Sequence, residues 1–544
     1  MSQVVSDEKS RYARLCALGL MALGIALRFA GYFANRSLWG DEIAIALNIR
    51  LRDLASLRYP LDYEQTMPIP LLVGIKSVVS VFGPSEYILR LLPLVVGCCT
   101  LPLLWFVYRR LFGSSIALAS LAFASIYRPL IYYSSEVKQY GLDALVTTIT
   151  LWLGFEVLQT GQARDWWRLI AWGAMGLWLS QPAVFVLAAV GLAAVLDQRF
   201  RTLTRWRAYC IIAAAAWMAV FGLLYFVSYR AVSHSAYMRA FWSSRFLNPG
   251  SPGFLRQLVD AIYVVLGAEY FDHVRAILLG ALFVVGLYGI WQRHYRNGIV
   301  VAISPFIGLF IAASLGQYPI ATRLVLFTFP LVIWVYATAI VTLSDLVRPK
   351  LRPTATAFLL LGLLAPTAVG SVKYASHFPQ REASRQIVAW MKATDSSAPV
   401  YIAFDEYLQW VYYAGDWSHP EALKVRLAQA FHSARRTEFF RVAESQETEE
   451  IVGQFPPEAS EGVERDLQWA RNEAAAILAL KQAHVWLFLP IYIDNPVMGH
   501  TFKQRKLFER LQEELNRGGA RLANTYSIGD GVALRYDLPP SATS

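Results

Sequence analysis

Residues 15–42 read LCALGLMALGIALRFAGYFANRSLWGDE. The part from Leu15 to Phe33 is apolar, and about 20 such residues are enough for a helix to cross the hydrocarbon of a membrane. The part that follows is polar and ends in two adjacent carboxylates, Asp41 and Glu42. The stretch therefore predicts a first membrane span followed by an Asp-Glu pair at the membrane surface. The two carboxylates are either solvated charges or groups that take part in a reaction.

The composition indicates a membrane protein. The 544 residues are 56% hydrophobic and 14% aromatic, with a mean hydropathy of +0.38, and the apolar residues come in long runs. The formal net charge is +11, but residues 375–544 have a net charge of −4 and the remainder has +15. A basic excess confined to the apolar part indicates membrane topology and not nucleic-acid binding.

The four cysteines imply neither a disulfide framework nor a metal site. They lie in or beside apolar runs and have no metal-ligand spacing. They are best read as small apolar residues in helices: Cys16, Cys98, Cys99 and Cys210.

About eleven apolar segments are predicted to span the membrane. They are 15–33, 87–108, 114–130, 142–158, 169–179, 183–196, 209–227, 276–291, 299–315, 324–343 and 355–372. Segment 66–82 is apolar but contains Pro68, Pro70 and Lys76, so we expect an interfacial helix on the outer face.

Arginine clusters fix the predicted orientation. Basic residues precede the first span, and every predicted inner loop contains an arginine cluster. Because basic loops stay on the cytoplasmic side, we expect a cytoplasmic N-terminus and, from the odd number of spans, a C-terminal domain on the outer face.

The tail has a different pattern. We predict helices at 381–392, 407–413 and 502–517, strands at 399–403, 484–490, 521–526 and 532–537, and a long acidic helical region at about 421–482. Alternating strands and helices indicate a small α/β domain. The predicted organisation is a mostly α multi-pass membrane domain, 1–374, followed by an extracytoplasmic α/β domain, 375–544. Neither part has a Walker A loop or a GxGxxG motif.

Three charged clusters fall on the predicted outer face. They are Asp41-Glu42 beside Trp39, Glu136-Val137-Lys138-Gln139-Tyr140, and the segment 317–323 that ends in Arg323. Any one of them is explained as well by solvated or snorkelling charges. Charges at a membrane boundary are nevertheless costly and tend to be functional, and an arginine fork suits a phosphate group.

At these motifs the chain resembles the GT-C superfamily of polyprenyl-phosphate-dependent glycosyltransferases, in the branch of protein O-mannosyltransferases and lipid A aminoarabinose transferases. The matching segments are SLWGDEIAIALN (37–48), TMPIPLL (66–72), YYSSEVKQYGLDAL (132–145) and QYPIATRLVLFTFPL (317–331). Met67 and Ile69 depart from the His-Pro-Pro-Leu pattern of the second segment. The resemblance covers about residues 1–375.

The resemblance implies a GT-C fold and inverting sugar transfer from a polyprenyl-phosphate donor to an acceptor hydroxyl. The acceptor would be a lipid, a glycan or a protein, and the setting the cytoplasmic (inner) membrane of a bacterium, with the C-terminal domain in the periplasm. Some relatives bind a divalent metal, but no residue pattern in this chain demands one.

Candidate roles follow from the chemistry of such a transfer. A carboxylate takes the proton of the acceptor hydroxyl, and cations stabilise the leaving phosphate. We expect catalytic roles for Asp41 and Glu42, with Asp41 as the base. The expected phosphate-binding residues are Lys138 and Arg323, with Lys76 a weaker candidate. The expected substrate-binding residues are Glu136, Tyr140, Trp39 and Tyr133.

Two other classes of protein are alternatives to a glycosyltransferase. A polyprenyl-lipid flippase or secondary transporter shares the need for a lipid-phosphate site, although transporters place charges near the bilayer midplane in repeated halves. A structural membrane scaffold does not explain three charged clusters on one face.

Overall fold

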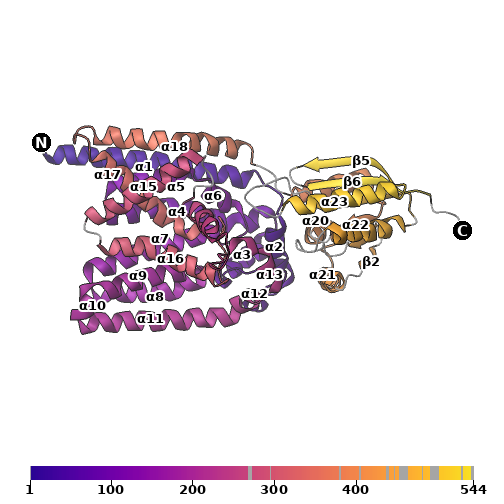
Figure 1. The fold of residues 1–544 in the computed structure, drawn as a ribbon, viewed down its shortest axis with the longest axis horizontal. Coiled ribbons are helices and arrows are strands. Elements are labelled where there is room, and N and C mark those ends of the chain that lie inside the picture. The colour runs from indigo at the N-terminus through magenta and orange to yellow at the C-terminus, as the bar shows by residue number, and fades with distance from the viewer. Residues whose placement is uncertain are drawn as a thin grey trace. The chain divides into compact units, whose positions relative to one another are not determined.

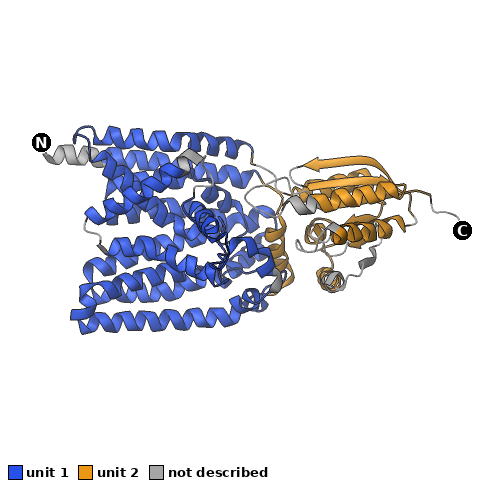
Figure 2. Ribbon diagram, viewed as in Figure 1, with its two compact units in different colours: residues 1–34, 54–377 blue, residues 35–53, 378–544 orange. Residues whose placement is uncertain are grey.

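The computed structural model describes residues 2–267, 273–293, 296–378, 382–403, 406–435, 440–445, 448–452, 463–480, 482–490, 501–528 and 531–540. The chain forms two compact units (Figure 2). The membrane unit contains residues 1–34 and 54–377, and the C-terminal unit contains residues 35–53 and 378–544. Residues 35–53, which the sequence-based division assigns to the membrane domain, thus cluster with the tail.

The membrane unit consists of long apolar helices that lie side by side (Figure 1). Within the described residues, seven helical stretches are long and apolar enough to cross a membrane. They are Arg11–Phe33, Glu86–Phe112, Tyr140–Thr160, Thr204–Ser233, Asn297–Ser314, Leu326–Ser344 and Arg352–Ser376. They belong to α1 (Ser2–Phe33), α4 (Glu86–Phe112), α7 (Tyr140–Thr160), α11 (Thr204–Leu224), α16 (Arg296–Ser314), α17 (Phe329–Ser344) and α18 (Arg352–Ser376).

A helix lies at each of the eleven predicted spans. Helices α5 (Ser114–Ile126) and α6 (Arg128–Tyr132) form a bent pair that makes an eighth span if counted as one. The other three predicted spans lie on α8 (Ala163–Leu179), α9 (Ala183–Leu196) and α15 (His273–Gln292), which do not meet the length or composition of a full span in the described residues. The predicted interfacial segment is α3 (Ile69–Phe82), a shorter apolar helix.

Short helices complete this unit. The α-helical ones are α10 (Gln198–Thr202), α12 (Arg230–Ser233), α13 (Ala236–Phe241) and α14 (Phe254–Val265). The 3₁₀ turns are η1 (Ser56–Arg58), η2 (Tyr133–Ser135), η4 (Ser243–Arg245) and η6 (Leu326–Thr328), and η3 (Tyr225–Tyr229) is a π-helical turn.

The break between α5 and α6 is stabilised by side chains from two other helices. The pair bends by 61°, and a helix end leaves backbone carbonyls without intrahelical partners. The fully buried Arg28 of α1 donates to the carbonyl oxygen of Ala124 at 3.2 Å, and Ser371 of α18 donates to that of Ile126 at 2.6 Å. The buried cation therefore lies at the negative end of a helix, where its charge is favoured.

Close packing of Gly97 on α4 places the turn η2 against the bundle. A Cβ atom at Gly97 would lie 2.1 Å from Oγ and 2.7 Å from Cβ of Ser134, distances that real atoms do not adopt. Ser134 is fully buried, and its hydroxyl donates to the carbonyl oxygen of Leu130. The missing side chain at Gly97 thus allows the turn before Glu136 to lie directly on α4.

The C-terminal unit contains a six-stranded mixed sheet with the order β2-β3-β1-β4-β6-β5. The strands are β1 (Val400–Ile402), β2 (Phe440–Ser445), β3 (Thr448–Val452), β4 (His484–Pro490), β5 (Arg521–Ile528) and β6 (Gly531–Asp537). Strand β1 is parallel to β3 and β4, and the other pairs are antiparallel. The register of the central pair aligns Tyr401 with Leu487.

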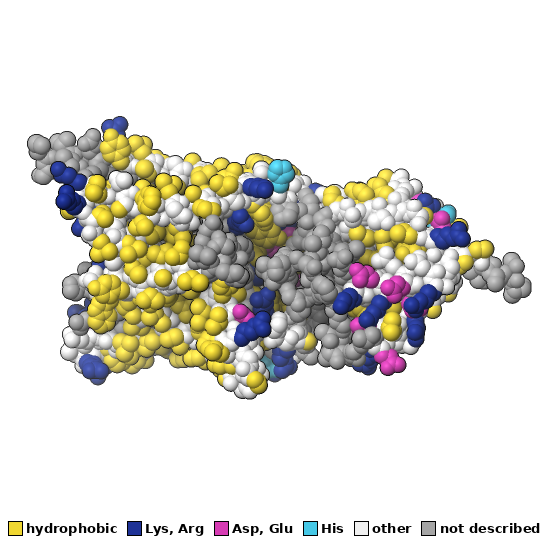
Figure 3. Space-filling view, turned by 45° about the horizontal axis from the view of Figure 1, so that its top comes forward, with side chains coloured by type: hydrophobic (Ala, Val, Ile, Leu, Met, Phe, Trp, Pro, Cys, Tyr) yellow, Lys and Arg dark blue, Asp and Glu magenta, His cyan; other side chains and the backbone are white. Residues whose placement is uncertain are grey.

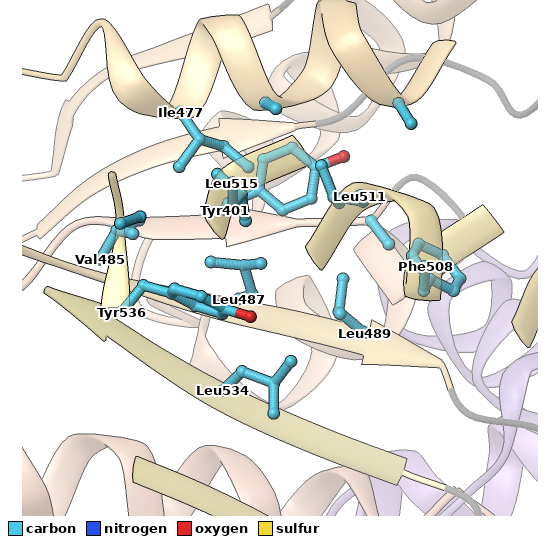
Figure 4. Packing of buried hydrophobic residues seen from close by; sticks show 14 of the residues in the cluster. Tyr401, Ile477, Val485, Leu487, Leu489, Phe508, Leu511, Leu515, Leu534 and Tyr536 are labelled. Atoms are coloured by element: carbon cyan, nitrogen blue, oxygen red, sulfur yellow. The ribbon is translucent and has the colours of Figure 1, made fainter. Parts of the chain in front are cut away.

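Helices cover both faces of the sheet. The core in Figure 4 lies under α22 (Val463–Leu478) and α23 (Thr501–Arg517), where Val485, Leu487 and Leu489 point to one face. The alternate residues Trp486 and Phe488 contact Trp390 and Trp410 of α19 (Ser384–Thr394) and α20 (Tyr407–Ala414). This period-two alternation is that of a strand buried on both faces. The unit also holds α2 (Gly40–Leu51) and α21 (Pro420–Arg435).

The prediction of one long helical region at 421–482 is wrong in its middle. The described residues there form α21, the strands β2 and β3, and α22, while 436–439, 446–447, 453–462 and 481 lie outside the described residues. Strand β3 pairs with the apolar strand β1, so pairing with the sheet overrides the weak β-propensity of an acidic segment. The helix α2 was not predicted. The mostly α membrane architecture with a C-terminal α/β domain is confirmed.

Surface composition differs between the units. In Figure 3, hydrophobic side chains cover most of the visible face of the membrane unit, and Lys and Arg lie near its margins. Such a lipid-facing belt is expected of a multi-pass membrane protein. Lys, Arg, Asp and Glu are interspersed on the visible face of the C-terminal unit, as expected of a water-exposed domain.

Replacing Gly97 by alanine tests the packing of η2. We expect Gly97→Ala to destabilise the protein by about 1–3 kcal/mol, because the added methyl group overpacks the contact with Ser134. The measurement is the Tm of the purified protein in detergent.

The matched control is Gly19→Ala in α1, where a Cβ would meet no atom within 4 Å. We expect an unchanged or slightly raised Tm, since alanine favours a helix over glycine. The double variant Gly97→Ala/Ser134→Gly should recover part of the loss. Equal Tm values for Gly97→Ala and Gly19→Ala would contradict the packing argument.

Candidate functional site

Helix α2 presents the Asp-Glu pair in its first turn. Trp39 is the N-cap residue, and its carbonyl oxygen accepts from the backbone N–H groups of Glu42 at 2.8 Å and Ile43 at 2.9 Å. Glu42 is 1% exposed, whereas Asp41 is half-buried. Carboxylates in the first turn are stabilised by the helix dipole, and of the two Asp41 is the more accessible.

The far end of α2 is also fixed within the C-terminal unit. The guanidinium of Arg50 lies 3.2 Å from the centroid of the Trp417 ring and 5.4 Å from that of Tyr412. Burial lowers the pKa of Arg50, partly offset by Tyr412. A stacked, partly desolvated cation of this kind contributes on the order of 1–2 kcal/mol, which holds α2 against α20 and the turn that follows α20.

The second candidate segment forms a tight turn at the start of α7. The backbone N–H of Lys138 donates to the carbonyl oxygen of Glu136 at 2.7 Å, which closes a three-residue γ-turn around Val137. Glu136, Val137 and Lys138 are 0%, 0% and 5% exposed. The Nζ atom of Lys138 donates to Oε1 of Gln65 at 2.6 Å. The turn therefore holds a cation and a carboxylate in a nearly water-free position.

Aromatic residues flank this turn. The ring of Tyr133 lies 5.0 Å from the ring of Tyr140 and 5.0 Å from that of Tyr132, both in edge-on geometry. Tyr140 is 4% exposed and begins α7, and Tyr133 is half-buried. Tyr133 belongs to η2, in which Ser134 packs on Gly97.

The late loop holds Arg323 against a different aromatic residue. The guanidinium of Arg323 is 5.0 Å from the centroid of the Trp242 ring, and Arg323 is 7% exposed. The backbone N–H of Ile320 donates to the carbonyl oxygen of Arg245 at 2.9 Å. A backbone hydrogen bond thus connects the loop before η6 to η4.

The loop that contains Tyr318 and Arg323 lies near the N-terminal end of α7, the helix that follows Lys138. Burial raises the pKa of Tyr318 well above its usual value, and the neighbouring Asp143, Tyr140 and Tyr229 add to that shift. Tyr318 is therefore neutral, and its hydroxyl donates to the carbonyl oxygen of Leu324 at 2.8 Å. Helix α7 also packs on η6.

The predicted site residues divide between the two units. The membrane unit contains Glu136, Lys138, Tyr133, Tyr140 and Arg323, of which the first four lie in or beside one turn. Lys76 is half-buried on α3 of the same unit. Trp39, Asp41 and Glu42 belong to the C-terminal unit.

Sequence reasoning missed the polar residues that hold these groups. Gln65, which accepts from Lys138, directly precedes the TMPIPLL motif, and its position there was the available signal. Trp242 lies far from the motifs in sequence, and nothing in the local pattern identifies it. Among the residues that the structure describes, no cluster of three or more His, Cys, Asp or Glu side chains has the arrangement of a metal site.

Comparisons with known proteins agree with this architecture. Residues 68–226 match the family model described as dolichyl-phosphate-mannose-protein mannosyltransferase. The structure is similar to ArnT from Cupriavidus metallidurans, solved with undecaprenyl phosphate and in the apo state, at 12% identity and a TM-score of 0.50 over 95% of this chain and 98% of that chain. At this identity the similarity establishes the fold alone.

A weaker similarity is to the oligosaccharyltransferase of Archaeoglobus fulgidus, solved with Zn and sulfate. The identity is 12% and the TM-score 0.48, over 74% of this chain and 61% of that chain. The chain thus spans about three fifths of the length of that protein. No curated protein matches the sequence.

Proposed function

We propose that the chain is an inverting glycosyltransferase of the GT-C superfamily, because residues 68–226 match the mannosyltransferase family model and the fold is similar to that of ArnT. It moves a sugar from a polyprenyl-phosphate donor to an acceptor hydroxyl of a lipid, glycan or protein. The reaction takes place on the outer face of the cytoplasmic membrane of a bacterium. Membrane topology supports this orientation, since basic residues cluster in the predicted inner loops.

The observation that carries the proposal is the pair of nearly buried cations at the N-terminal end of α7. Lys138 and Arg323 are 5% and 7% exposed, and Tyr318 in the loop of Arg323 lies near Tyr140, two residues after Lys138. A cation in a site poor in water interacts more strongly with an anion than one in bulk water. The pair therefore suits a leaving phosphate, with the arginine fork binding two oxygens and the lysine acting as a point charge. Lys76 is a further candidate for the same group.

The proposed step is a direct displacement at the anomeric carbon. The acceptor oxygen forms a bond to C1, the bond from C1 to the phosphate oxygen breaks, and the acceptor proton passes to the carboxylate of Asp41. The leaving polyprenyl phosphate gains negative charge, which Lys138 and Arg323 stabilise. Attack opposite the leaving group inverts the configuration at C1.

The other residues have supporting roles in this proposal. Half-buried Asp41 is the base, and buried Glu42 orients the start of α2. Glu136 fixes the turn of Lys138 or binds a sugar hydroxyl, while Tyr133, Tyr140 and Trp39 offer aromatic faces for the sugar.

Mass spectrometry of membrane lipids and surface glycans tests the proposal directly. A strain with the gene should contain a product heavier by one glycosyl unit, and a strain without it should lack that product. A flippase without transfer chemistry would change the sidedness of a lipid but create no new covalent product, so the two functions give different results.

Replacing Asp41 by asparagine tests the base. Asp41→Asn keeps the shape of the side chain and removes its proton-accepting charge, so we expect product formation to fall about 10²–10⁴-fold. The measurement is the amount of glycosylated product in a strain that expresses the variant at the wild-type level.

The matched control is Asp53→Asn, a change of an exposed carboxylate that follows the same helix. We expect near-wild-type product from it. Full product from Asp41→Asn would remove Asp41 from the mechanism.

Replacing Arg323 by alanine tests the phosphate site. Loss of charge-assisted hydrogen bonds worth roughly 1.5–3 kcal/mol should weaken binding of undecaprenyl phosphate about 10–100-fold. The measurement is titration of the purified protein with undecaprenyl phosphate, and Arg323→Lys should lose less than Arg323→Ala.

The control here is Arg348→Ala, since Arg348 is exposed and lies in a predicted inner loop. It should bind undecaprenyl phosphate as the wild-type protein does. Unchanged binding by Arg323→Ala would refute the phosphate assignment.

A further inference from the structure

The N-terminus of α2 lacks a capping side chain of its own. The first N–H groups of a helix have no intrahelical partner, and a Ser, Thr, Asp or Asn usually accepts from one of them. Here the N-cap residue is Trp39, which makes no such bond. The N–H of Gly40 instead donates to Oε2 of Glu382 at 2.8 Å. A residue more than three hundred positions away in the chain therefore caps the helix of Asp41.

Glu382 is built into the C-terminal unit. It is 4% exposed, and Gln409 of α20, which is 1% exposed, donates to its Oε2 atom at 3.1 Å. A Cβ atom at Gly531 on β6 would lie 2.3 Å from the carbonyl oxygen of Glu382, so the backbone of Glu382 packs directly on the sheet. The side chain of Glu382 is thus held from two sides.

The backbone next to Glu382 is strained. Ala383 has φ of 43° and is fully buried, although the left-handed region costs an alanine roughly 1–2 kcal/mol. Such strain persists where the surrounding structure imposes it and often accompanies function. The strained residue sets the direction in which the chain leaves Glu382 and enters α19.

Three more contacts attach the segment before Asp41 to the same helices. The Ser37 hydroxyl donates to Gln386 of α19, and the backbone N–H of Leu38 donates to the Tyr413 hydroxyl of α20 at 2.7 Å. The guanidinium of Arg385 donates to the carbonyl oxygen of Asn35 at 2.6 Å. Residues 35–40 are therefore fixed by α19, α20 and Glu382.

We propose that Glu382 is a positioning residue for Asp41: by capping α2 within the C-terminal unit, it fixes the orientation of the proposed base. This inference rests on the proposed function, in which Asp41 accepts the proton. A carboxylate suits the position, because its negative charge lies at the positive end of the helix and its hydrogen bond to Gly40 is charge-assisted. Residues 378–544 then supply the cap of α2 and are required for transfer.

Hydrogen–deuterium exchange of residues 36–46 in the purified full-length protein tests the positioning without any substrate. In Glu382→Ala, the amides of this segment should exchange about 10–100-fold faster, because a charge-assisted cap is lost. In Glu382→Gln, the amide oxygen still accepts from Gly40, so the exchange should stay within about 3-fold of the wild type. Glycosylated product in cells should follow the same order.

A pair of substitutions at Gly40 tests the same bond from the donor side. Gly40→Pro removes the N–H at the first helical position, where proline is tolerated, and Trp39 already has the extended backbone (φ −98°, ψ 169°) that precedes proline. Gly40→Ala keeps the N–H, and its Cβ would meet Gln409 at 3.4 Å, an ordinary contact. We expect fast exchange and loss of product in Gly40→Pro and neither in Gly40→Ala. If Glu382→Ala fails to fold, the comparison of Gly40→Pro with Gly40→Ala tests the role of this hydrogen bond in its place.

The control for general destabilisation is Tyr401→Phe, which removes the hydrogen bond from Tyr401 to the buried Glu473 in the core of the same unit. It should lower the Tm while leaving exchange of residues 36–46 and product formation unchanged. If Tyr401→Phe changes them as much as Glu382→Ala does, the effect of Glu382 is merely structural and the inference fails.

The outcomes separate the two proposals. If Glu382→Ala accelerates exchange of residues 36–46 while Asp41→Asn retains product, the cap exists but Asp41 is not the base. If Asp41→Asn loses product while Glu382→Ala keeps wild-type exchange and product, Glu382 does not position Asp41. Loss of product in both variants with accelerated exchange in Glu382→Ala supports both proposals.

Discussion

Hydrocarbon offers no hydrogen-bond partner to a peptide group, so the backbone of the membrane unit must find its hydrogen-bond partners within the protein. Straight helices satisfy it within themselves, but the 61° break between α5 and α6 does not. Arg28 and Ser371 supply the missing donors to the carbonyls of Ala124 and Ile126. The buried arginine, which looks like an electrostatic liability, is therefore a consequence of bending a helix where water is absent.

The same constraint explains what the sequence could predict. Membrane helices are long, uniform and separated by charged loops, so all the apolar segments were found, together with the motifs at Glu136 and Arg323. The strands at 484–490 and 521–537 were found because their apolar residues alternate and are bounded by turns. Strands β2 and β3 were missed because β3 forms through pairing with β1, and β2 through pairing with β3. Local sequence does not encode these contacts.

For the candidate site, the sequence suggests which residues react but not which residues support them. Asp41, Lys138 and Arg323 were identified by charge at a membrane boundary. Gln65 and Trp242, which contact Lys138 and Arg323, are ordinary polar and aromatic residues whose role appears only in three dimensions. Glu382 is the extreme case, because it acts on a helix that belongs to a distant part of the chain. Reactive groups can be recognised in a sequence by their residue type, whereas the residues that support them are recognised only by their positions in the structure.

The C-terminal unit is built from two separate parts of the chain, and this has a consequence for biosynthesis. Its first piece, residues 35–53, is made before the intervening residues 54–377, and the rest of the unit follows them. At cellular synthesis rates this delay is on the order of tens of seconds. A twelve-residue helix is marginal in water without partners, so α2 waits unsupported on the ribosome-bound chain until its scaffold emerges. Helix α2 therefore becomes ordered only after residues 378–544, which contact it in the folded unit, have been made.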